Sequence, residues 1–396
     1  MAKRRIIFIN LHANEFLVKT LNKIIFGQSA AIKHGYLIKY LLERDDIEVC
    51  SFITKRGLSL SYTTTNPILQ SFRFLEHEWV LNANNINKKK ITLIKNESDI
   101  KPDDIIVSYS YYGPTQLCFD KRPDAIRVIC QIHFATQYSD LEQDFSPHAM
   151  YNESNLMKFS GMWRQELPWY KNEFITIPFV YQDRFKRIKP FKERKAKAVG
   201  VGTITYMSHI AEYYGDSCAQ PARRNCRELG KERPDLLDSF NFDYLEDSQN
   251  KKHKSTGNPI IKAYQRLNAK MKNGQQKQYF SFNMVDKFND YKIAVVGEEI
   301  MGIPGIGFVE AMACGCAYIG QTVGYYEEYG MKEGVHYIGY DGTKEDLIAK
   351  LEYWERPENQ TALERIANAG YEFVRKNFNK DVVAENLIDK LLSIQK

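Results

Sequence analysis

The stretch "MGIPGIGFVEAMACGCAYIGQTVGY", residues 301–325, decides the fold. Three glycines (Gly302, Gly305 and Gly307) come first, and one carboxylate, Glu310, follows them in a run that is typical of a helix. Glycines ahead of a helix let backbone N–H groups approach an anion, and the positive helix end favours negative charge there. A carboxylate about one turn into the helix can accept hydrogen bonds from the two vicinal hydroxyls of a ribose. The stretch therefore indicates a site for a nucleotide diphosphate, with an ordinary strand-to-helix turn and a surface glutamate as the alternative.

Short β-branched runs alternate with helical segments on both sides of this stretch. Several, such as "IIVSY" and "KIAVV", are apolar on both faces, as strands of a covered parallel sheet are. The alternation predicts doubly wound α/β sheets. The expected strands are Arg5–Asn10, Glu48–Thr54, Asp104–Tyr109, Ile126–His133, Glu173–Phe179, Ala198–Gly202, Tyr291–Val296, Cys316–Ile319 and His336–Tyr340.

The length of 396 residues suits two domains. The basic stretch Arg184–Ala198 separates the two series of strands and is interpreted as a linker, with a solvated surface loop as the alternative. Residues 213–278 are polar, and we expect helices joined by a mobile loop there. The predicted domains are residues 1–185 and 196–375, followed by a C-terminal helix over 376–396.

Composition narrows the possible partners. The net charge of +6, from 55 basic and 49 acidic residues, is too mild for a nucleic-acid binder but is compatible with an anionic substrate or membrane surface. The seven scattered cysteines form no CxxC pair, which argues against zinc and favours a reducing cytosol. No apolar run approaches the roughly 20 residues of a membrane span. We therefore expect a cytoplasmic protein without a metal ion or other cofactor.

The C-terminal part resembles the group-one glycosyltransferases, which have the GT-B architecture. "EAMACG" at residues 310–315 matches the family directly, Gly324 and Glu327 match its glycine turn and acid, and Gly334 matches a later glycine. The helical ending "DGTKEDLIAKLEYWERPENQTALERIANAGYEFVRKNF" is similar to the spore-maturation-like branch. The resemblance covers about residues 291–396 well and the N-terminal half only loosely.

This resemblance implies two Rossmann-like domains facing across a cleft. The N-terminal domain would bind the acceptor, the C-terminal domain would bind a nucleotide sugar, and the last helix would cross back to the first domain. Glu310 would hold the ribose. The other donor-binding residues that the resemblance implies are Gly305, Ile306 and Gly307, through their amides, and Thr322, Val323 and Gly324 on the nucleotide side.

The chain departs from the family in two places. The family often has a second glutamate eight positions before the ribose-binding one, where this chain has Gly302; Glu298 or Glu299 could replace it, and Glu299 is our catalytic candidate. The family also has basic residues soon after the first C-domain strand, and here the nearest are Arg223 and Arg224. An arginine fork matches phosphate oxygens, so these are candidate diphosphate ligands. The alternative is an exposed pair at a helix start.

The N-terminal half offers candidates for the acceptor side. Gly27, Gln28 and Ser29 could form a helix-opening turn beside the cleft. His133 ends the strand "RVICQIH", where α/β sheets place ligands, and similar enzymes carry a histidine near the transferred sugar. We take His133 as a catalytic candidate, with a hydrogen-bonded loop histidine as the alternative; His12 also follows a strand. "FLVKTLNKIIF", residues 16–26, suits either a membrane interface or a core helix with exposed lysines.

The implied function is a hexosyl- or other glycosyltransferase that retains anomeric configuration and needs no metal. Its partners would be a nucleotide-sugar donor and a saccharide or lipid-linked saccharide acceptor, in bacterial surface polysaccharide or glycolipid synthesis, with peripheral membrane contact and no nucleic acid. The protein would stabilise the leaving diphosphate and align the acceptor. The alternatives are a nucleotide-sugar epimerase of the same fold and a non-catalytic sugar-nucleotide-binding relative. A dehydrogenase is disfavoured because "NLHANEF" lacks GxGxxG.

Overall fold

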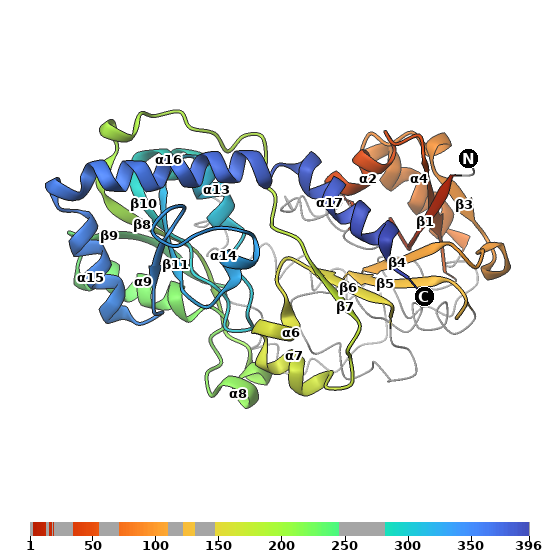
Figure 1. The fold of residues 1–396 in the computed structure, drawn as a ribbon, viewed down its shortest axis with the longest axis horizontal. Helices are drawn as coiled ribbons and strands as arrows, with labels where there is room; N and C mark the ends of the chain where they lie inside the picture. The colour runs from red at the N-terminus through yellow and green to blue at the C-terminus, as the bar shows by residue number, and fades with distance from the viewer. Residues whose placement is uncertain are drawn as a thin grey trace. The chain divides into compact units, whose positions relative to one another are not determined.

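The structure is a computed structural model that describes residues 3–12, 16, 17, 19, 35–54, 71–109, 122–130, 147–244 and 282–395. The chain forms two compact units. The first contains Met1–Lys158, Trp163–Val180 and Asn379–Lys396, and the second contains Phe159–Met162 and Tyr181–Phe378. Each unit is built around one parallel β-sheet (Figure 1), which confirms the expected α/β class.

The sheet of the first unit has the strand order β3-β2-β1-β4-β5-β6-β7, and every pair is parallel. Its strands are β1 (Arg4–Ile9), β2 (Ile47–Phe52), β3 (Thr92–Ile94), β4 (Ile105–Tyr109), β5 (Ile126–Cys130), β6 (Ala149–Asn152) and β7 (Glu173–Thr176). Strands β3 and β6 were not predicted, because three or four residues are too few to show a period. The helical segments are α2 (Gly35–Leu41), α4 (Arg73–Ala83), η1 (Lys88–Lys90) and η2 (Glu97–Asp99). Two short helices, α6 (Leu156–Phe159) and α7 (Gly161–Glu166), each have residues in both units, since Phe159–Met162 belong to the second.

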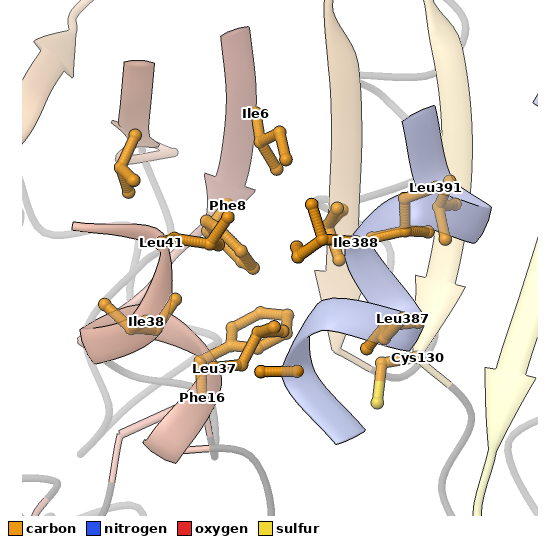
Figure 2. Close-up of a cluster of buried hydrophobic side chains, with 14 of the residues drawn as sticks. Ile6, Phe8, Phe16, Leu37, Ile38, Leu41, Cys130, Leu387, Ile388 and Leu391 are labelled. Carbon is orange, nitrogen blue, oxygen red and sulfur yellow. The ribbon is translucent and has the colours of Figure 1, made fainter. Parts of the chain in front are cut away.

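The last helix of the chain, α17 (Lys380–Ser393), belongs to the first unit. It packs against α2, and Figure 2 shows its apolar side chains directed toward those of β1 and α2. Leu387, Ile388 and Leu391 are fully buried there. Burying such a side chain stabilises a fold by about 1.5–3 kcal/mol. The apolar stripe of α17 is therefore part of the first core.

The sheet of the second unit has the order β12-β11-β10-β8-β9, and every pair is again parallel. Its strands are β8 (Lys195–Thr205), β9 (Leu237–Tyr244), β10 (Tyr291–Val295), β11 (Ala317–Gln321) and β12 (Ile338–Tyr340). The chain runs from β8 to β9 on one side and then returns to place β10 on the other side of β8. Such a reversal of strand order is where open α/β sheets bind ligands, outside the carboxyl ends of the strands.

Helices flank this second sheet, and α16 lies beside α13 and β11 (Figure 1). Thr343 caps α15, because its side chain accepts a hydrogen bond from the Asp346 N–H. Helix α16 begins at Gln360, with Asn359 as its N-cap. The helical segments are η5 (Phe191–Glu193), α8 (Ser208–Tyr214), α9 (Pro221–Glu232), α12 (Met284–Asp290), α13 (Gly307–Ala313), α14 (Tyr325–Glu328), α15 (Lys344–Trp354), η6 (Pro357–Asn359) and α16 (Gln360–Asn377).

One expectation about this unit needs correction. Strand β9 lies where we expected only helices and a loop; it is an edge strand whose side chains are mostly half-buried, so its sequence "LDSFNFDY" has no continuous apolar run. The stretch Arg184–Ala198 belongs to the second unit, and most of its side chains are exposed, as in a surface loop. Arg194 within it is nevertheless buried and donates to the carbonyl oxygens of Cys314 (2.7 Å) and Phe288 (3.2 Å).

Candidate functional site

The loop at residues 297–306 connects the carboxyl end of β10 to α13, and we call it the glycine loop. Gly297 and Gly302 have φ angles of +74° and +86°, which L side chains rarely adopt. A Cβ atom at Gly302 would lie 2.5 Å from the carbonyl oxygen of Phe159. Within the described residues, no acceptor pairs with the backbone N–H groups of Gly305, Ile306 or Gly307. Three backbone N–H donors are therefore available at the place where the sequence predicts an anion-binding site.

Arg223 of α9 lies directly under the glycine loop. Its guanidinium donates to the carbonyl oxygens of Val296 (Nε, 2.9 Å), Thr203 (Nη1, 2.9 Å) and Gly297 (Nη2, 3.4 Å). It thus ties β8 to β10 at the reversal of strand order. A Cβ atom at Gly305 would lie 2.6 Å from Nη2 of Arg223, so the loop needs glycine there. In the described part of the chain Arg223 forms no ion pair, and its charge remains uncompensated beneath the open amides.

Arg224 is engaged elsewhere. Its Nη2 lies 2.8 Å from Oδ2 of Asp216, and this hydrogen bond lowers the pKa of the Asp216 carboxyl. The structure therefore brings only Arg223 of the two predicted arginines to the glycine loop. The alternative of an exposed pair is wrong for Arg223, which is buried.

Glu310 lies in the first turn of α13 and is 9% exposed. Burial raises the pKa of its carboxyl to about 8, and the charge of Arg184 opposes this rise. No hydrogen bond from the described residues contributes to that pKa. A buried carboxylate without donors is costly in free energy. Two ribose hydroxyls would supply the missing donors, as the sequence interpretation requires.

This burial predicts a stability effect for Glu310→Gln. Between the ordinary pKa of 4.5 and about 8, the folded protein holds a proton that the unfolded chain releases, so wild-type stability falls as pH rises through this window. Glutamine has no charge to desolvate. We expect equal thermal unfolding temperatures near pH 4.5, and a variant more stable by about 1–3 kcal/mol above pH 8. Calorimetric unfolding across this range measures the difference; a gap that does not change with pH would contradict it.

Thr322, Val323 and Gly324 connect β11 to α14. The N–H and Oγ1 of Thr322 donate to the Tyr340 carbonyl oxygen at 2.9 and 3.2 Å, which fixes the start of this turn. Val323 is 44% exposed, and Gly324 has a φ of +95°. The turn thus offers an exposed apolar side chain that can pack against a base.

Phe159 is a site residue that the sequence analysis missed. A Cβ atom at Gly324 would lie 3.3 Å from its ring, and its carbonyl oxygen packs against Gly302. Its ring also meets that of Tyr325 edge-on, with 4.7 Å between centroids. Phe159 therefore supports both loops of the candidate site, although no motif in the sequence marks it.

The two glutamates of the glycine loop have different roles. Glu298 is buried, and its Oε1 accepts hydrogen bonds from Gln321 N–H (3.0 Å) and from the hydroxyls of Tyr318 (3.2 Å) and Tyr326. It thus ties the glycine loop to β11. Glu299 is half-buried and its Oε1 accepts from Nε2 of Gln220 at 3.2 Å. Glu299 is accordingly the less constrained of the two substitutes that we proposed.

The candidates of the N-terminal half are described only in part. His12 is fully buried, its ring 5.4 Å from that of His77. Nε2 of His77 lies 3.1 Å from Oγ of Ser51, and burial lowers the pKa of His77 to about 4. Such burial is typical of core histidines. Gly27, Gln28 and His133 lie outside the described residues, as does most of residues 16–26, and their roles stay predictions.

Known proteins resemble this chain in family and in fold. Residues 246–389 match the family described as glycosyl transferase-like. No curated protein matches the chain. Among solved structures, sucrose-phosphate synthase from Thermosynechococcus elongatus aligns with a TM-score of 0.51 at 12% identity, covering 99% of this chain and 100% of that one. The chain has the GT-B fold.

Further structures agree with this fold assignment. An α,α-trehalose-phosphate synthase (UDP-forming) from Burkholderia vietnamiensis gives a TM-score of 0.52 at 10% identity and covers 100% of this chain and 98% of its own. HepE from Anabaena in complex with UDP gives 0.50 at 12% identity, with coverages of 98% and 100%. The expected GT-B fold and the resemblance to glycosyltransferases are thereby confirmed, and the GT-B chain carries a glycosyltransferase family domain. The spore-maturation-like branch stays a prediction.

Among the described residues, no helix is both long and apolar enough to span a bilayer. No group of three or more His, Cys, Asp or Glu side chains among them is arranged to hold a metal ion.

Proposed function

We propose that the protein is a glycosyltransferase that moves a sugar from a nucleotide-sugar donor to an acceptor hydroxyl. One arrangement carries the proposal: the open amides of the glycine loop lie over the buried charge of Arg223, and the buried side chain of Glu310, to which no described residue donates a hydrogen bond, follows in the next helix. The amides and the guanidinium match a diphosphate, and the carboxylate matches a ribose. The GT-B fold and the family domain support this assignment.

The chemistry that we propose is electrostatic. As the glycosidic bond to the diphosphate breaks, negative charge builds on the leaving phosphate, where the amides and Arg223 stabilise it. Arg223 supplies positive charge without a metal. The resemblance to group-one enzymes supports retention of configuration, with the leaving phosphate taking the acceptor proton. UDP is the first nucleotide to test, because HepE is bound to UDP and the trehalose-phosphate synthase is UDP-forming.

Donor turnover tests this proposal against its rivals. The protein is incubated with UDP-glucose, UDP-galactose, UDP-N-acetylglucosamine or GDP-mannose, with and without a bacterial glycolipid and oligosaccharide extract, and diphosphate release is followed. Release that rises with the extract supports a transferase. Isomerised sugar without release points to an epimerase, and binding without turnover points to a non-catalytic relative; either result would overturn the proposal.

For the acceptor we propose a saccharide or lipid-linked saccharide of bacterial surface synthesis, used at the inner face of the membrane. Helix α4 supports this with an exposed apolar stripe of Phe72 (48%), Leu75 (62%) and Trp79 (45%) at helical spacing. Three exposed lysines follow in η1, and Lys88 pairs with Glu78 of α4 at 3.0 Å. Apolar side chains beside basic ones suit an anionic lipid surface.

We expect the triple variant Phe72→Ser, Leu75→Ser, Trp79→Ser to bind vesicles of phosphatidylcholine and phosphatidylglycerol at least about tenfold more weakly than wild type, because the inserted apolar area is lost. Co-sedimentation measures this. Tyr353→Ser is the matched control, since Tyr353 is also 49% exposed but lies in the second unit. A wild-type protein that stays in the supernatant, or a triple variant that sediments equally, would disprove the contact.

A further inference from the structure

Gln220 lies where β8, α9 and the glycine loop meet. It is the N-cap residue of α9, and its side chain is buried. Its Oε1 accepts a hydrogen bond from the backbone N–H of Thr205 at 2.8 Å, and its Nε2 donates to Oε1 of Glu299 at 3.2 Å. A backbone N–H can only donate, so Oε1 must face Thr205 and Nε2 must face Glu299. The orientation of this amide is therefore fixed by chemistry.

Hydrogen bonds also hold the backbone around Gln220 in place. Ala219 N–H donates to the carbonyl oxygen of Thr205 at 2.8 Å, and Ile300 N–H donates to that of Ala219 at 2.8 Å. Glu299 N–H donates to the carbonyl oxygen of Ile303 at 2.7 Å. Gln220 and Glu299 are thus restrained through both main chain and side chain, which is how a positioned carboxylate is held.

The second oxygen of Glu299 has no such partner. Oε2 is buried, and none of the described residues donates a hydrogen bond to it. Leaving a buried carboxylate oxygen unpaired costs free energy, and such orphans in a native fold call for an explanation. A ligand hydroxyl that reaches Oε2 would remove the cost.

We propose that Gln220 is a positioning residue: it holds Glu299 so that Oε2 accepts a hydrogen bond from a hydroxyl of the transferred sugar. This inference rests on the proposed function. It adds that Gln220 and Glu299 together recognise the sugar of the donor. It also accounts for Gly302 at the position of the family's first glutamate, because Glu299, fixed by Gln220, takes over the contact from the same loop.

Other charged and titratable groups surround this pair. Arg223 lies one turn along α9 and donates to the carbonyl oxygens of Val296, just before the glycine loop, and of Gly297 within it. Arg224 forms an ion pair with Asp216, which lies two residues before Cys218. Burial raises the pKa of the Cys218 thiol, which meets the backbone N–H of Gln220. On the glycine loop, Oε1 of Glu298 is already bonded to the hydroxyls of Tyr318 and Tyr326, while its Oε2, like that of Glu299, receives no hydrogen bond from the described residues.

The variant Gln220→Glu turns this geometry into a pH-dependent test. When protonated, the new carboxyl group matches the amide: its carbonyl oxygen accepts from Thr205 N–H and its O–H donates to Glu299. When ionised, it places a second negative charge against Glu299, and two adjacent carboxylates repel each other. We therefore expect near wild-type kcat/KM near pH 5.5 and a loss of at least about tenfold at pH 8. Gln220→Ala should lose at least about tenfold at both pH values.

The assay uses whichever of the four nucleotide sugars named above wild type turns over fastest, and calorimetry with the matching nucleoside diphosphate runs beside it. The diphosphate lacks the sugar, so its Kd should stay within about twofold of wild type in both Gln220 variants. Asn225→Asp is the matched control, because it makes the same charge change on α9 and should leave the pH profile unaltered.

The outcomes separate this inference from the proposed function. Wild type that turns over no donor overturns both. Active wild type with Gln220 variants of equal kcat/KM overturns the positioning role alone. Variants that lose diphosphate binding together with turnover also overturn it, since Gln220 would then only support the loop. A Gln220→Glu profile that falls equally at both pH values contradicts the amide geometry.

Discussion

Glu310→Gln is expected to weaken nucleoside diphosphate binding by at least tenfold while the protein stays folded. The carboxylate is 9% exposed and receives no hydrogen bond from the described residues, so a bound ribose would supply both of its donors. Hydrogen bonds to a charged group contribute about 1.5–3 kcal/mol each, which corresponds to a loss of about ten- to a hundredfold per bond. Glutamine keeps one acceptor and loses the charge.

The pH dependence of binding gives this expectation a second readout. The ribose hydroxyls favour the ionised carboxylate, whereas burial raises its pKa to about 8 in the free protein. Binding therefore releases a proton below this pH, and wild-type affinity should rise from about pH 6 to 8 and then level off. Glu310→Gln should show no such rise. Equal affinities of the two proteins at pH 8 would exclude Glu310 from the ribose site.

Arg223→Met is expected to damage both the fold and diphosphate binding. The change leaves the carbonyl oxygens of Thr203, Val296 and Gly297 without their donors. Unpaired buried groups cost about 1–3 kcal/mol each, and partial relaxation should bring the total loss of unfolding free energy to about 3 kcal/mol. Removing the charge beneath the open amides should weaken UDP binding by about thirtyfold or more, and uridine binding far less.

Arg224→Met is the matched control for this prediction. Arg224 is the next residue of α9, but its partner is Asp216, and both side chains are about one-third exposed. Pairs of this kind contribute about 0–1 kcal/mol. Denaturant unfolding and calorimetry on both variants separate the two arginines. A larger loss of UDP affinity in Arg224→Met than in Arg223→Met would reverse the assignment.

Features formed by residues that are close together in the chain could be predicted from the sequence. Glycines, a carboxylate one turn into a helix and a preceding apolar strand are adjacent in the chain, so the glycine loop and Glu310 were found from residues 291–310 alone. The same is true of the C-terminal helix expected over residues 376–396, which the structure has as α17 (Lys380–Ser393).

The sequence alone could not predict contacts between residues that lie far apart in the chain. Gln220 donates a hydrogen bond to Glu299, which is 79 positions away in the chain. Phe159 precedes all strands of the second sheet in the sequence, yet it packs against Gly302. Neither residue belongs to a motif, so only the fold identifies it. Arg223 and Arg224 are neighbours of identical chemistry, and the register of α9 decides that one supports the glycine loop while the other pairs with Asp216.

The most direct test of the donor site is a calorimetric panel of UDP, GDP, ADP, CDP and CMP against wild type and Glu310→Gln at pH 8. We predict that one nucleotide class binds wild type clearly and that the variant binds it at least tenfold more weakly. Binding by none of the five, or equal binding by both proteins, would contradict the assignment of a nucleotide-sugar site to the glycine loop and Glu310.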